Sequence, residues 1–438
     1  MYKKSLLSVL LFLISCENLK YSDDAGNFVH VDKSGNIYVS GYTEGDLDKN
    51  SNVGGKDIFL SKFNSDGNKL WTKQWGSNLD DYGRSSVSND SGDIYVTGYT
   101  KGSFDGYKNS GKTDSFLTKF NVDGKKLWTK QWGGNSSDYG KSVVAEGSDY
   151  IYVVGETEGE FDYQLNYGYS DIFITKFDAD GKELWTKLFG TEDSDLAKNA
   201  AMDDLGNIYI TGYTFGCFDN NECYEYSDIV FSDIFLSKIS NDGSILWTKQ
   251  WGTELGDYGS SLKVYKDHIY IAGYTNSDLD NNISASPGGE DIFVTKFNTG
   301  GDKKWTKQIG TASMDYAFSL SLDSSGNIYV TGSTHGEFSD YFNSGNTDIV
   351  LIKLNSEGTV LWTKQWGTKT NDIAFSIAND KSDNLFITGS YNDDLDYYDT
   401  DDENRCISYS EIFLTKLSSS GDKIWNREWG TGAELYCN

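Results

Sequence analysis

Residues 94–132 read IYVTGYTKGSFDGYKNSGKTDSFLTKFNVDGKKLWTKQW, and three phrases in this stretch return in seven successive units of the chain. The first phrase, Ile-Tyr-Val-x-Gly, places its glycine at Gly41, Gly98, Gly155, Gly212, Gly273, Gly332 and Gly389. The second, Asp-Ile-Phe-Leu-x-Lys-Phe, begins at Asp57, Asp114, Asp171, Asp233, Asp291, Asp348 and Glu411. The third, Leu-Trp-Thr-Lys-Gln-Trp-Gly, places its first tryptophan at Trp71, Trp128, Trp185, Trp247, Trp305, Trp362 and Trp425. Since all 12 tryptophans of the protein fall in the third phrase, the chain is an array of units of about 57 residues.

Each unit is predicted to form four short strands, called a to d in chain order. In the second unit these are residues 84–89, 94–99, 115–121 and 126–132, and the tight turns between a and b and between c and d contain glycine. Four antiparallel strands per unit, without helices, predict an all-β fold, a seven-bladed β-propeller of four-stranded antiparallel blades. The sequence leaves open whether a strand is shared between the first and last blades, although the tight hairpins favour seven separate blades.

The repeated pattern Asp-x-x-Gly-Asn-Ile-Tyr-Val-Thr-Gly, followed by Asp-Ile-Phe-Leu-x-Lys-Phe-x-x-Asp-Gly and Trp, resembles the bacterial β-propeller repeat family called SBBP. The resemblance covers about residues 23–430, which is nearly all of the expected mature chain. It implies a propeller fold, and it implies no common activity.

The composition restricts the class of partner. The 438 residues carry 66 acidic and 38 basic side chains, a formal net charge of −28. Because nucleic-acid binding needs clustered lysine and arginine, nucleic acid and bare anionic membrane are poor partners. Cations and basic patches on other proteins remain open.

The N-terminus has the pattern of an export signal. Lys3 and Lys4 precede an apolar run that ends in Leu13-Ile14-Ser15-Cys16, which resembles a bacterial lipobox. We expect residues 1–15 to be a lipoprotein signal peptide, Cys16 to carry the lipid, residues 16–22 to form a tether and residues 23–438 to form the propeller. The expected location is the bacterial cell envelope, on a periplasmic or cell-surface face, with the lipid as the membrane contact; an ordinary signal peptide is the alternative.

The connections between strands b and c are predicted to present the binding surface. They are long, differ between units and are rich in acidic residues, and variable loops on a rigid frame commonly carry recognition. The strongest candidate lies in the seventh unit: Asp393, Asp394, Asp396, Asp399, Asp401, Asp402 and Glu403. We therefore expect a binding module for a protein or glycan partner in the envelope or on a neighbouring surface; the alternatives are a solvated rim without a ligand and a hydrolase or lyase acting on polysaccharide or peptide.

Four cysteines follow Cys16, and their positions predict two disulfides. Cys217 and Cys223 share the b–c connection of unit four, and Cys406 lies in that of unit seven. Units four and seven are distant in a seven-membered ring, so cross-pairing exceeds the reach of a disulfide. The prediction is Cys217–Cys223 and Cys406–Cys437, with four free thiols as the alternative.

Two b–c connections weakly resemble a calcium loop, in which carboxylate and amide oxygens alternate along the chain. The candidate ligands are Asp46, Asp48, Asn50 and Asp57 in the first unit and Asp278, Asp280 and Asn282 in the fifth. Calcium is the one cofactor that the sequence raises, and a solvated acidic loop is the alternative.

The remaining chemical candidates have structural interpretations. The tryptophans recur in every unit, which favours packing between blades over a multivalent lectin. The recurring lysines, such as Lys62 and Lys73, are expected to pair with carboxylates such as Asp57. The three histidines lie in different units and match no triad or metal spacing, so no catalytic residue is assigned and the chain leans away from an enzyme.

Overall fold

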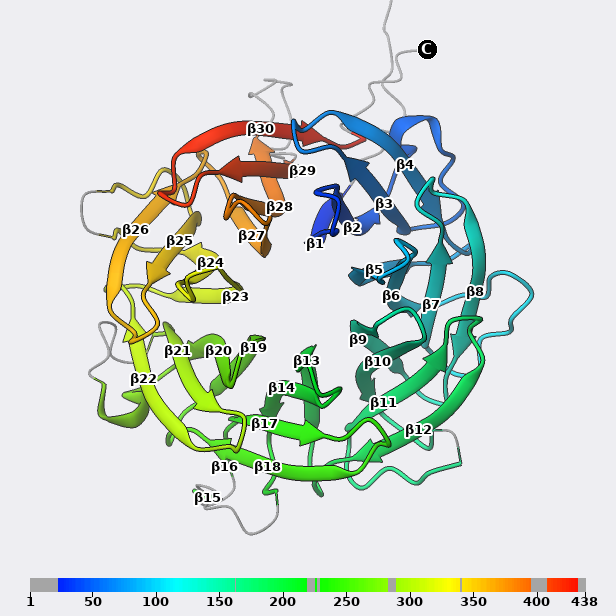
Figure 1. Ribbon diagram of the computed structural model, residues 1–438, viewed down its shortest axis with the longest axis horizontal. Coiled ribbons are helices and arrows are strands. Elements are labelled where there is room, and N and C mark those ends of the chain that lie inside the picture. The colour runs from blue at the N-terminus through cyan, green and yellow to red at the C-terminus, as the bar shows by residue number, and fades with distance from the viewer. Residues whose placement is uncertain are drawn as a thin grey trace, which may run out of the picture.

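The computed structural model describes residues 23–161, 163–218, 225–226, 229–282, 289–338, 341–394 and 408–431. It shows seven four-stranded antiparallel sheets arranged in a ring, with strand a of each blade innermost and strand d outermost (Figure 1). This confirms the predicted seven-bladed β-propeller. No helix in this described part of the chain has the length and apolar character of a membrane span.

The strands follow the repeat phrases. The first four blades are β1 (Ala25–Val31), β2 (Ile37–Thr43), β3 (Asp57–Phe63), β4 (Lys69–Trp75); β5 (Asp81–Ser88), β6 (Ile94–Thr100), β7 (Asp114–Phe120), β8 (Lys126–Trp132); β9 (Asp138–Glu146), β10 (Tyr150–Thr157), β11 (Asp171–Asp178), β12 (Glu183–Phe189); and β13 (Asp195–Met202), β14 (Ile208–Thr214), β17 (Asp233–Ile239), β18 (Ile245–Trp251). The last three are β19 (Asp257–Tyr265), β20 (His268–Thr275), β21 (Asp291–Asn298), β22 (Lys303–Ile309); β23 (Asp315–Leu322), β24 (Ile328–Thr334), β25 (Asp348–Leu354), β26 (Val360–Trp366); and β27 (Asp372–Asn379), β28 (Leu385–Asp394), β29 (Ser408–Leu417), β30 (Lys423–Trp429). Two 3-10 turns, η1 (Leu47–Lys49) and η2 (Leu279–Asn281), and a small hairpin, β15 (Glu225–Tyr226) with β16 (Ile229–Val230), lie in b–c connections.

The glycine of the first repeat phrase is required by a bulge in strand a. In the second blade the pairing of β5 with β6 shifts between Gly83 and Ser85. The shift brings the Tyr82 carbonyl against the opposite strand, so that a Cβ on Gly98 would lie 1.8 Å from the Tyr82 oxygen. The equivalent glycine of every blade meets the same obstacle at 1.8–2.1 Å, which explains why no side chain stands at this position.

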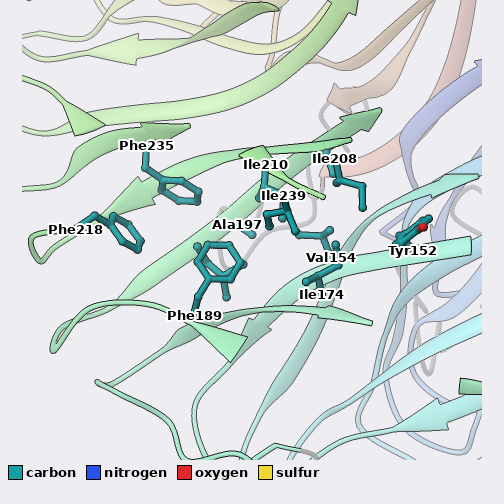
Figure 2. Packing of buried hydrophobic residues seen from close by; sticks show 12 residues of the cluster. Tyr152, Val154, Ile174, Phe189, Ala197, Ile208, Ile210, Phe218, Phe235 and Ile239 are labelled. Carbon is teal, nitrogen blue, oxygen red and sulfur yellow. The ribbon is translucent and has the colours of Figure 1, made fainter. Parts of the chain in front are cut away.

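The hydrophobic core is divided into seven clusters, one at each interface between adjacent blades. Figure 2 shows the cluster between the third and fourth blades, where Val154 and Ile174 of one blade face Ile208 and Ile210 of the next. Because both faces of a middle strand pack on neighbouring blades, strand c is buried along its whole length, as in β7. Blades are therefore stabilised by their neighbours.

The ring closes without a shared strand. The first sheet is β1-β2-β3-β4 and the last is β27-β28-β29-β30, each complete in itself. The two blades are joined by the same contacts that join the others, including a hydrogen bond from the Val29 backbone N–H to Ser376 Oγ (3.1 Å). Its equivalent between the second and third blades runs from Val143 N–H to Ser85 Oγ (3.3 Å). The arrangement with seven separate blades is confirmed.

Candidate binding face and axial cluster

The b–c connections have a common root. Six residues after the repeat glycine, each of six blades places a buried apolar side chain: Leu47, Phe104, Phe161, Phe218, Leu279 and Phe338. In five of these six blades the glutamine of strand d fixes this root; in the second blade Gln131 Oε1 accepts from the Phe104 backbone N–H (3.2 Å) and Gln131 Nε2 donates to the Gly102 carbonyl (2.9 Å). In the third blade Leu188 takes the place of the glutamine, and the Phe161 backbone N–H donates to the Gln164 carbonyl (3.0 Å). Sequence reasoning treated these loops as variable throughout and missed this root, although its constant offset was visible in the repeat.

Beyond the root, the loop of the third blade exposes large apolar side chains. Tyr163, Leu165, Tyr167 and Tyr169 are exposed by 95%, 77%, 67% and 75%. Phe342, in the corresponding loop of the sixth blade, is exposed by 84%. A cluster of such residues on one loop is a feature of interaction sites, because it leaves apolar area in water that a partner would cover.

The predicted acidic loop of the seventh blade is described only in part. Asp393 and Asp394 extend strand β28, where they pair with Tyr409 and Ser408 of β29. The other five residues, Asp396, Asp399, Asp401, Asp402 and Glu403, lie outside the described residues. Their role in partner binding stays a prediction.

The calcium candidates of the first and fifth blades are held by protein partners. Asp48 Oδ2 accepts from Lys69 Nζ (2.6 Å) and from Thr72 Oγ1 (2.5 Å). Asp280 is bound in the same way by Lys303 Nζ (2.6 Å). Asp46 accepts from the Asn52 backbone N–H, Asn50 donates to the Leu47 carbonyl, and Asp57 accepts from the Val53 N–H.

Each of these side chains thus has a hydrogen-bond partner within the protein. Asp278 precedes the turn η2 without a side-chain capping hydrogen bond, and Asn282 follows it, with its side-chain amide donating to the Leu279 carbonyl (2.7 Å). Within the described ranges, no group of three or more His, Cys, Asp or Glu could hold a metal ion. A lysine of strand d binds the middle aspartate of each of the two loops, and calcium binding there stays a prediction.

Of the predicted cysteine sites, only Cys217 lies among the described residues. Cys16, Cys223, Cys406 and Cys437 fall outside them, as do the signal peptide and the tether. The lipidation of Cys16 and the pairing of the other four cysteines stay predictions.

Pairs of buried carboxyl groups stand at the junctions between blades. At the first junction, a Cβ on Gly76 would lie 2.5 Å from Asp57 Oδ1 and 2.7 Å from Asp81 Oδ2. Both aspartates are fully buried, and Asp57 Oδ1 has no hydrogen-bond partner within the described structure. Burial, with a contribution from Asp57, raises the pKa of Asp81 to about 6.

The same arrangement recurs around the ring. Burial also raises the pKa of Asp138 and Asp257 to about 7 and that of Asp195 and Asp315 to about 6. The backbone N–H and hydroxyl groups of the preceding turn oppose the shift; Asp257 Oδ2, for example, accepts from Thr253 N–H (2.6 Å) and Thr253 Oγ1 (2.9 Å). These groups are structural, since they lie within the junctions and are closed to solvent.

The recurring lysine of strand c bridges to the next blade, which corrects the expectation that Lys62 pairs with Asp57. Three of its equivalents do pair with carboxylates, as expected: Lys119 with Asp93 (2.9 Å), Lys176 with Glu146 (3.8 Å) and Lys353 with Asp323 (3.6 Å). Lys62 Nζ donates to the Val122 carbonyl (3.0 Å) in the c–d turn of the second blade and lies 5.3 Å from the centre of the Tyr38 ring. Asp57 instead accepts from Gln74. The lysine contact is repeated seven times: Lys62–Val122, Lys119–Ala179, Lys176–Asn241, Lys238–Thr299, Lys296–Ser356, Lys353–Ser419 and Lys416–Ser65.

The tryptophans pack between blades, as predicted. A Cβ on Gly124 of the second blade would lie 2.9 Å from the ring of Trp71 in the first. Trp75 contacts Phe120 with ring centres 4.8 Å apart. Both indole positions of strand d thus serve the interface between neighbouring blades.

Three cations gather on the inner strands of the second, third and fourth blades. Arg84, Lys141 and Lys198 each stand three residues after the first aspartate of strand a, at or next to the bulge. Figure 1 places their strands β5, β9 and β13 side by side around the centre of the ring. The same position holds Asn27, Ser260, Phe318 and Phe375 in the other blades, so the positive charge is confined to one side.

One carboxylate accompanies the three cations. Glu156 of β10 forms an ion pair with Lys141 (3.0 Å) and is buried, with its side chain 7% exposed. It replaces the tyrosine that most other blades place after the repeat glycine. Arg84 Nη2 donates to Tyr99 Oη (2.7 Å), whereas Arg84 Nε is buried without a hydrogen-bond partner in the described structure.

Tyrosine rings surround this axial cluster, which we define as Arg84, Lys141, Glu156 and Lys198. Tyr42, Tyr82, Tyr99 and Tyr139 form one chain of ring contacts with centres 4.8–5.1 Å apart. A second chain runs through Tyr213, Tyr258, Tyr274 and Tyr316, with centres 4.8–5.0 Å apart. The gap between the two series of rings lies at β10 and β13, where Glu156 and Leu196 take the places of tyrosines.

The three histidines lie in different blades, as the sequence indicated. His30 binds Ser86 Oγ (2.9 Å) and Ser88 Oγ (2.8 Å) of the next blade, and burial lowers the pKa of its imidazole to about 3. His268 is paired with the adjacent Asp267, and His335 contacts Thr347. His30 is thus a neutral side chain at the interface of the first two blades.

Comparison with known sequences identifies the repeat. Residues 184–217 and 304–339 match the family model described as the SBBP beta-propeller repeat. An uncharacterized WD repeat-containing protein of Acanthamoeba polyphaga mimivirus is 21% identical over 410 residues, covering 72% of this chain and 29% of that protein. The regulatory protein FlaEY of Caulobacter vibrioides is 24% identical over 303 residues, covering 60% of this chain and 31% of that protein. The chain thus spans less than a third of the length of either relative.

Solved structures with a similar arrangement include the WD40 domain of Neurospora crassa Pan2 and the polysaccharide lyase Uly1. The former is 12% identical, with a TM-score of 0.48 over 84% of this chain and 86% of the other. The latter is 10% identical, with a TM-score of 0.47 over 90% of each chain. Together with the repeat match, the seven-bladed ring makes this chain a propeller that carries SBBP-type repeats.

Proposed function

We propose that the protein is a binding module of the bacterial cell envelope, lipid-anchored through Cys16, which recognises a partner through its b–c loops. The observation that carries the proposal is the loop of the third blade, where Tyr163, Tyr167 and Tyr169 are exposed above a fixed root at Phe161. Tyrosine supplies a large, stiff contact area with a polar tip, which is why it is enriched in binding surfaces.

The charge of the chain indicates the chemistry of the partner. The net charge of −28 and the acidic residues Asp393–Glu403 would attract a basic surface and repel an acidic one. A protein that carries exposed tyrosines in one b–c loop and acidic residues in others complements a partner surface that combines basic and apolar side chains. We therefore propose a protein partner.

The experiment places a photo-crosslinking amino acid at Tyr163 or Tyr167 in the full chain, expressed in its native cells. Leu205 is the matched control, because it is 82% exposed but lies in an a–b turn. We expect the same discrete product from both tyrosine positions and none from Leu205. Its yield should fall when the ionic strength is raised, since acidic loops on a basic surface are screened by salt.

A product from Leu205 equal to that from the tyrosines, or no discrete product from either tyrosine, would contradict the proposal. A product that glycoside hydrolases remove would assign a glycan instead of a protein. The anchor is tested separately by metabolic labelling with a fatty acid, which Cys16→Ser should abolish; labelling that survives this change would place the lipid elsewhere.

A further inference from the structure

The axial cluster contains more positive charge than the protein itself neutralises. Arg84, Lys141 and Lys198 bring three cations to adjacent inner strands, and Glu156 is the one carboxylate paired among them. The protein has a net charge of −28, whereas the axial cluster, with three basic side chains and one acidic one, has a net positive charge.

Two of these cations have unused hydrogen-bond donors. Arg84 Nε is buried and makes no hydrogen bond, although its Nη2 is held by Tyr99. No acceptor lies within hydrogen-bond distance of Lys198 Nζ among the described residues; the ammonium lies 5.0 Å from the centre of the Tyr213 ring. The side chain of Lys198 is half-buried, so its ammonium, which has no protein acceptor among these residues, remains accessible to a ligand.

The electrostatic environment of Lys198 agrees with this geometry. Burial, with further contributions from Lys141 and Arg84, lowers the pKa of Lys198 to about 8, and Glu156 opposes the shift. The three cations are therefore close enough to act on one another, and Glu156, the one acid that acts on Lys198, opposes the lowering more strongly than either Lys141 or Arg84 alone adds to it. An anion bound between them would supply the missing charge and accept the free N–H groups.

Tyrosine rings lie next to the three cations. Tyr99, Tyr139 and Tyr213 stand beside the cations, and the interruption of the tyrosine chains at Glu156 coincides with the cluster. Arginine presents donors that match the two oxygens of a carboxylate or sulfate, and the neighbouring phenol rings suit a ring-shaped carrier.

We propose that the axial cluster is a binding site for an oxyanion, the carboxylate or sulfate group of an acidic ligand. The guanidinium of Arg84 and the Nζ of Lys198 bind the anion, and Lys141, held by Glu156, adds positive charge between them. The site is separate from the exposed loops that carry the proposed partner binding, so either can fail without the other.

The test is calorimetric titration of the full chain at low ionic strength and about pH 6.5, with sodium sulfate, sodium glucuronate and neutral glucose as probes. We expect at least one of the two anions to bind and glucose not to bind. Binding of both anions would assign the site to either oxyanion, and binding of glucuronate alone would assign it to a carboxylated sugar. No binding of either anion up to about 10 mM would overturn the proposal.

Two substitutions locate the site. Lys198→Met should weaken anion binding at least tenfold, whereas Lys33→Met, which removes the same charge from an exposed ion pair on another part of the molecule, should leave it unchanged. Equal effects of the two changes would show that only the net charge matters and would refute the site.

A third measurement does not depend on finding the right probe. Because Lys198 is an unpaired cation, Lys198→Met should raise the melting temperature of the ligand-free protein or leave it unchanged. A loss of several degrees would show that Lys198 supports the fold, which contradicts a ligand-binding role. For the wild type, anion affinity should decrease as the pH rises through about 8, since Lys198 loses its proton there while Arg84 stays charged.

Discussion

At the scale of single residues, the buried aspartates at the blade junctions decide how the protein responds to pH. Asp81, Asp138, Asp195, Asp257 and Asp315 all have raised pKa values, between about 6 and about 7, because burial disfavours the carboxylate. In the unfolded chain such groups titrate near 4. Between about pH 4 and pH 7 the folded state therefore holds protons that the unfolded state has lost.

The sign of the effect follows from this difference. Where the folded state binds more protons, the free energy of unfolding falls as the pH rises, so these groups make the protein more stable near pH 5 than near pH 7.5. One pKa unit corresponds to about 1.4 kcal/mol, so each such carboxyl contributes on the order of 2–4 kcal/mol to the pH dependence. Aspartates with lowered pKa values, such as Asp48 and Asp203, act in the opposite sense below about pH 4.

The first prediction isolates one of these carboxyls. Asp257→Asn removes a group with a pKa of about 7, so the melting temperature of the variant should change less between pH 5 and pH 7.5 than that of the wild type. Differential scanning calorimetry at the two pH values measures both slopes. The exposed Asp242→Asn is the control and should leave the slope as it is. Parallel curves for Asp257→Asn and the wild type would refute the assignment.

At the scale of the strand, strand c of each blade carries a lysine that donates a hydrogen bond to the next blade. Lys62 of β3 reaches the Val122 carbonyl, and six other blades repeat the contact with their own lysine. A hydrogen bond from a charged donor contributes more than one between neutral groups, about 1.5–3 kcal/mol. The seven contacts form a closed belt around the ring, because Lys416 of the seventh blade reaches the Ser65 carbonyl of the first.

The second prediction concerns this belt. Lys62→Met keeps the aliphatic stem but removes the donor, and it should cost about 1–3 kcal/mol, which lowers the melting temperature of a chain of this length by about 1–4 °C. Lys33→Met, which breaks an exposed pair with Asp90, should cost less than about 1 kcal/mol. Thermal unfolding of both variants makes the comparison. Equal small losses would show that the contact to Val122 contributes no more than a surface ion pair.

The strands themselves were predictable from the sequence, because their cause is local. Alternation and Asp-Gly turns predicted residues 126–132, and β8 has those bounds. Strand a was predicted to begin at Arg84, but β5 begins at Asp81, since the residues before the bulge pair again with β6. The partner of Lys62 was wrong for another reason: the Val122 carbonyl is a backbone atom 60 residues away, and no side-chain pattern marks it.

The candidate site was less predictable than the fold. The axial cluster is formed by one column of the repeat, Arg84, Lys141 and Lys198, which is charged in three blades and neutral in four. A repeat is recognised by the positions that stay the same in every unit. This position differs between the blades, so the repeat pattern does not point to it. Which blades are neighbours around the ring, and hence that the three charges meet, follows only from the closed structure.

At the scale of the whole molecule, the last and first blades are joined by the same hydrogen bonds as other adjacent blades, although no strand-to-strand peptide connection runs between them. Thr431 N–H donates to Asp24 Oδ2 (2.6 Å), as Ser77 N–H donates to Asp81 Oδ2 in the first junction. Lys416 reaches the Ser65 carbonyl and Ser376 accepts from Val29, so the inner and outer contacts are present as well. In the first junction two residues, Asn78 and Leu79, stand between Ser77 and Asp80, so a peptide link of the same length at the seventh junction would join Thr431 to Asp23 through two residues.

The third prediction follows from that equivalence. If all seven junctions are alike, the chain can be opened at any of them and closed at the seventh. A circular permutant that joins Thr431 to Asp23 through two residues, with new ends between Asn135 and Ser136, should fold into the same ring and melt within a few degrees of residues 23–431 in their native order. Circular dichroism and calorimetry compare the two chains, and the native-order chain of the same residues is the control. A permutant that fails to fold, beside a native-order chain that folds, would show that the first blade has a special role in closing the ring. The contacts across the seam argue against such a role, since each of them is found between other blades.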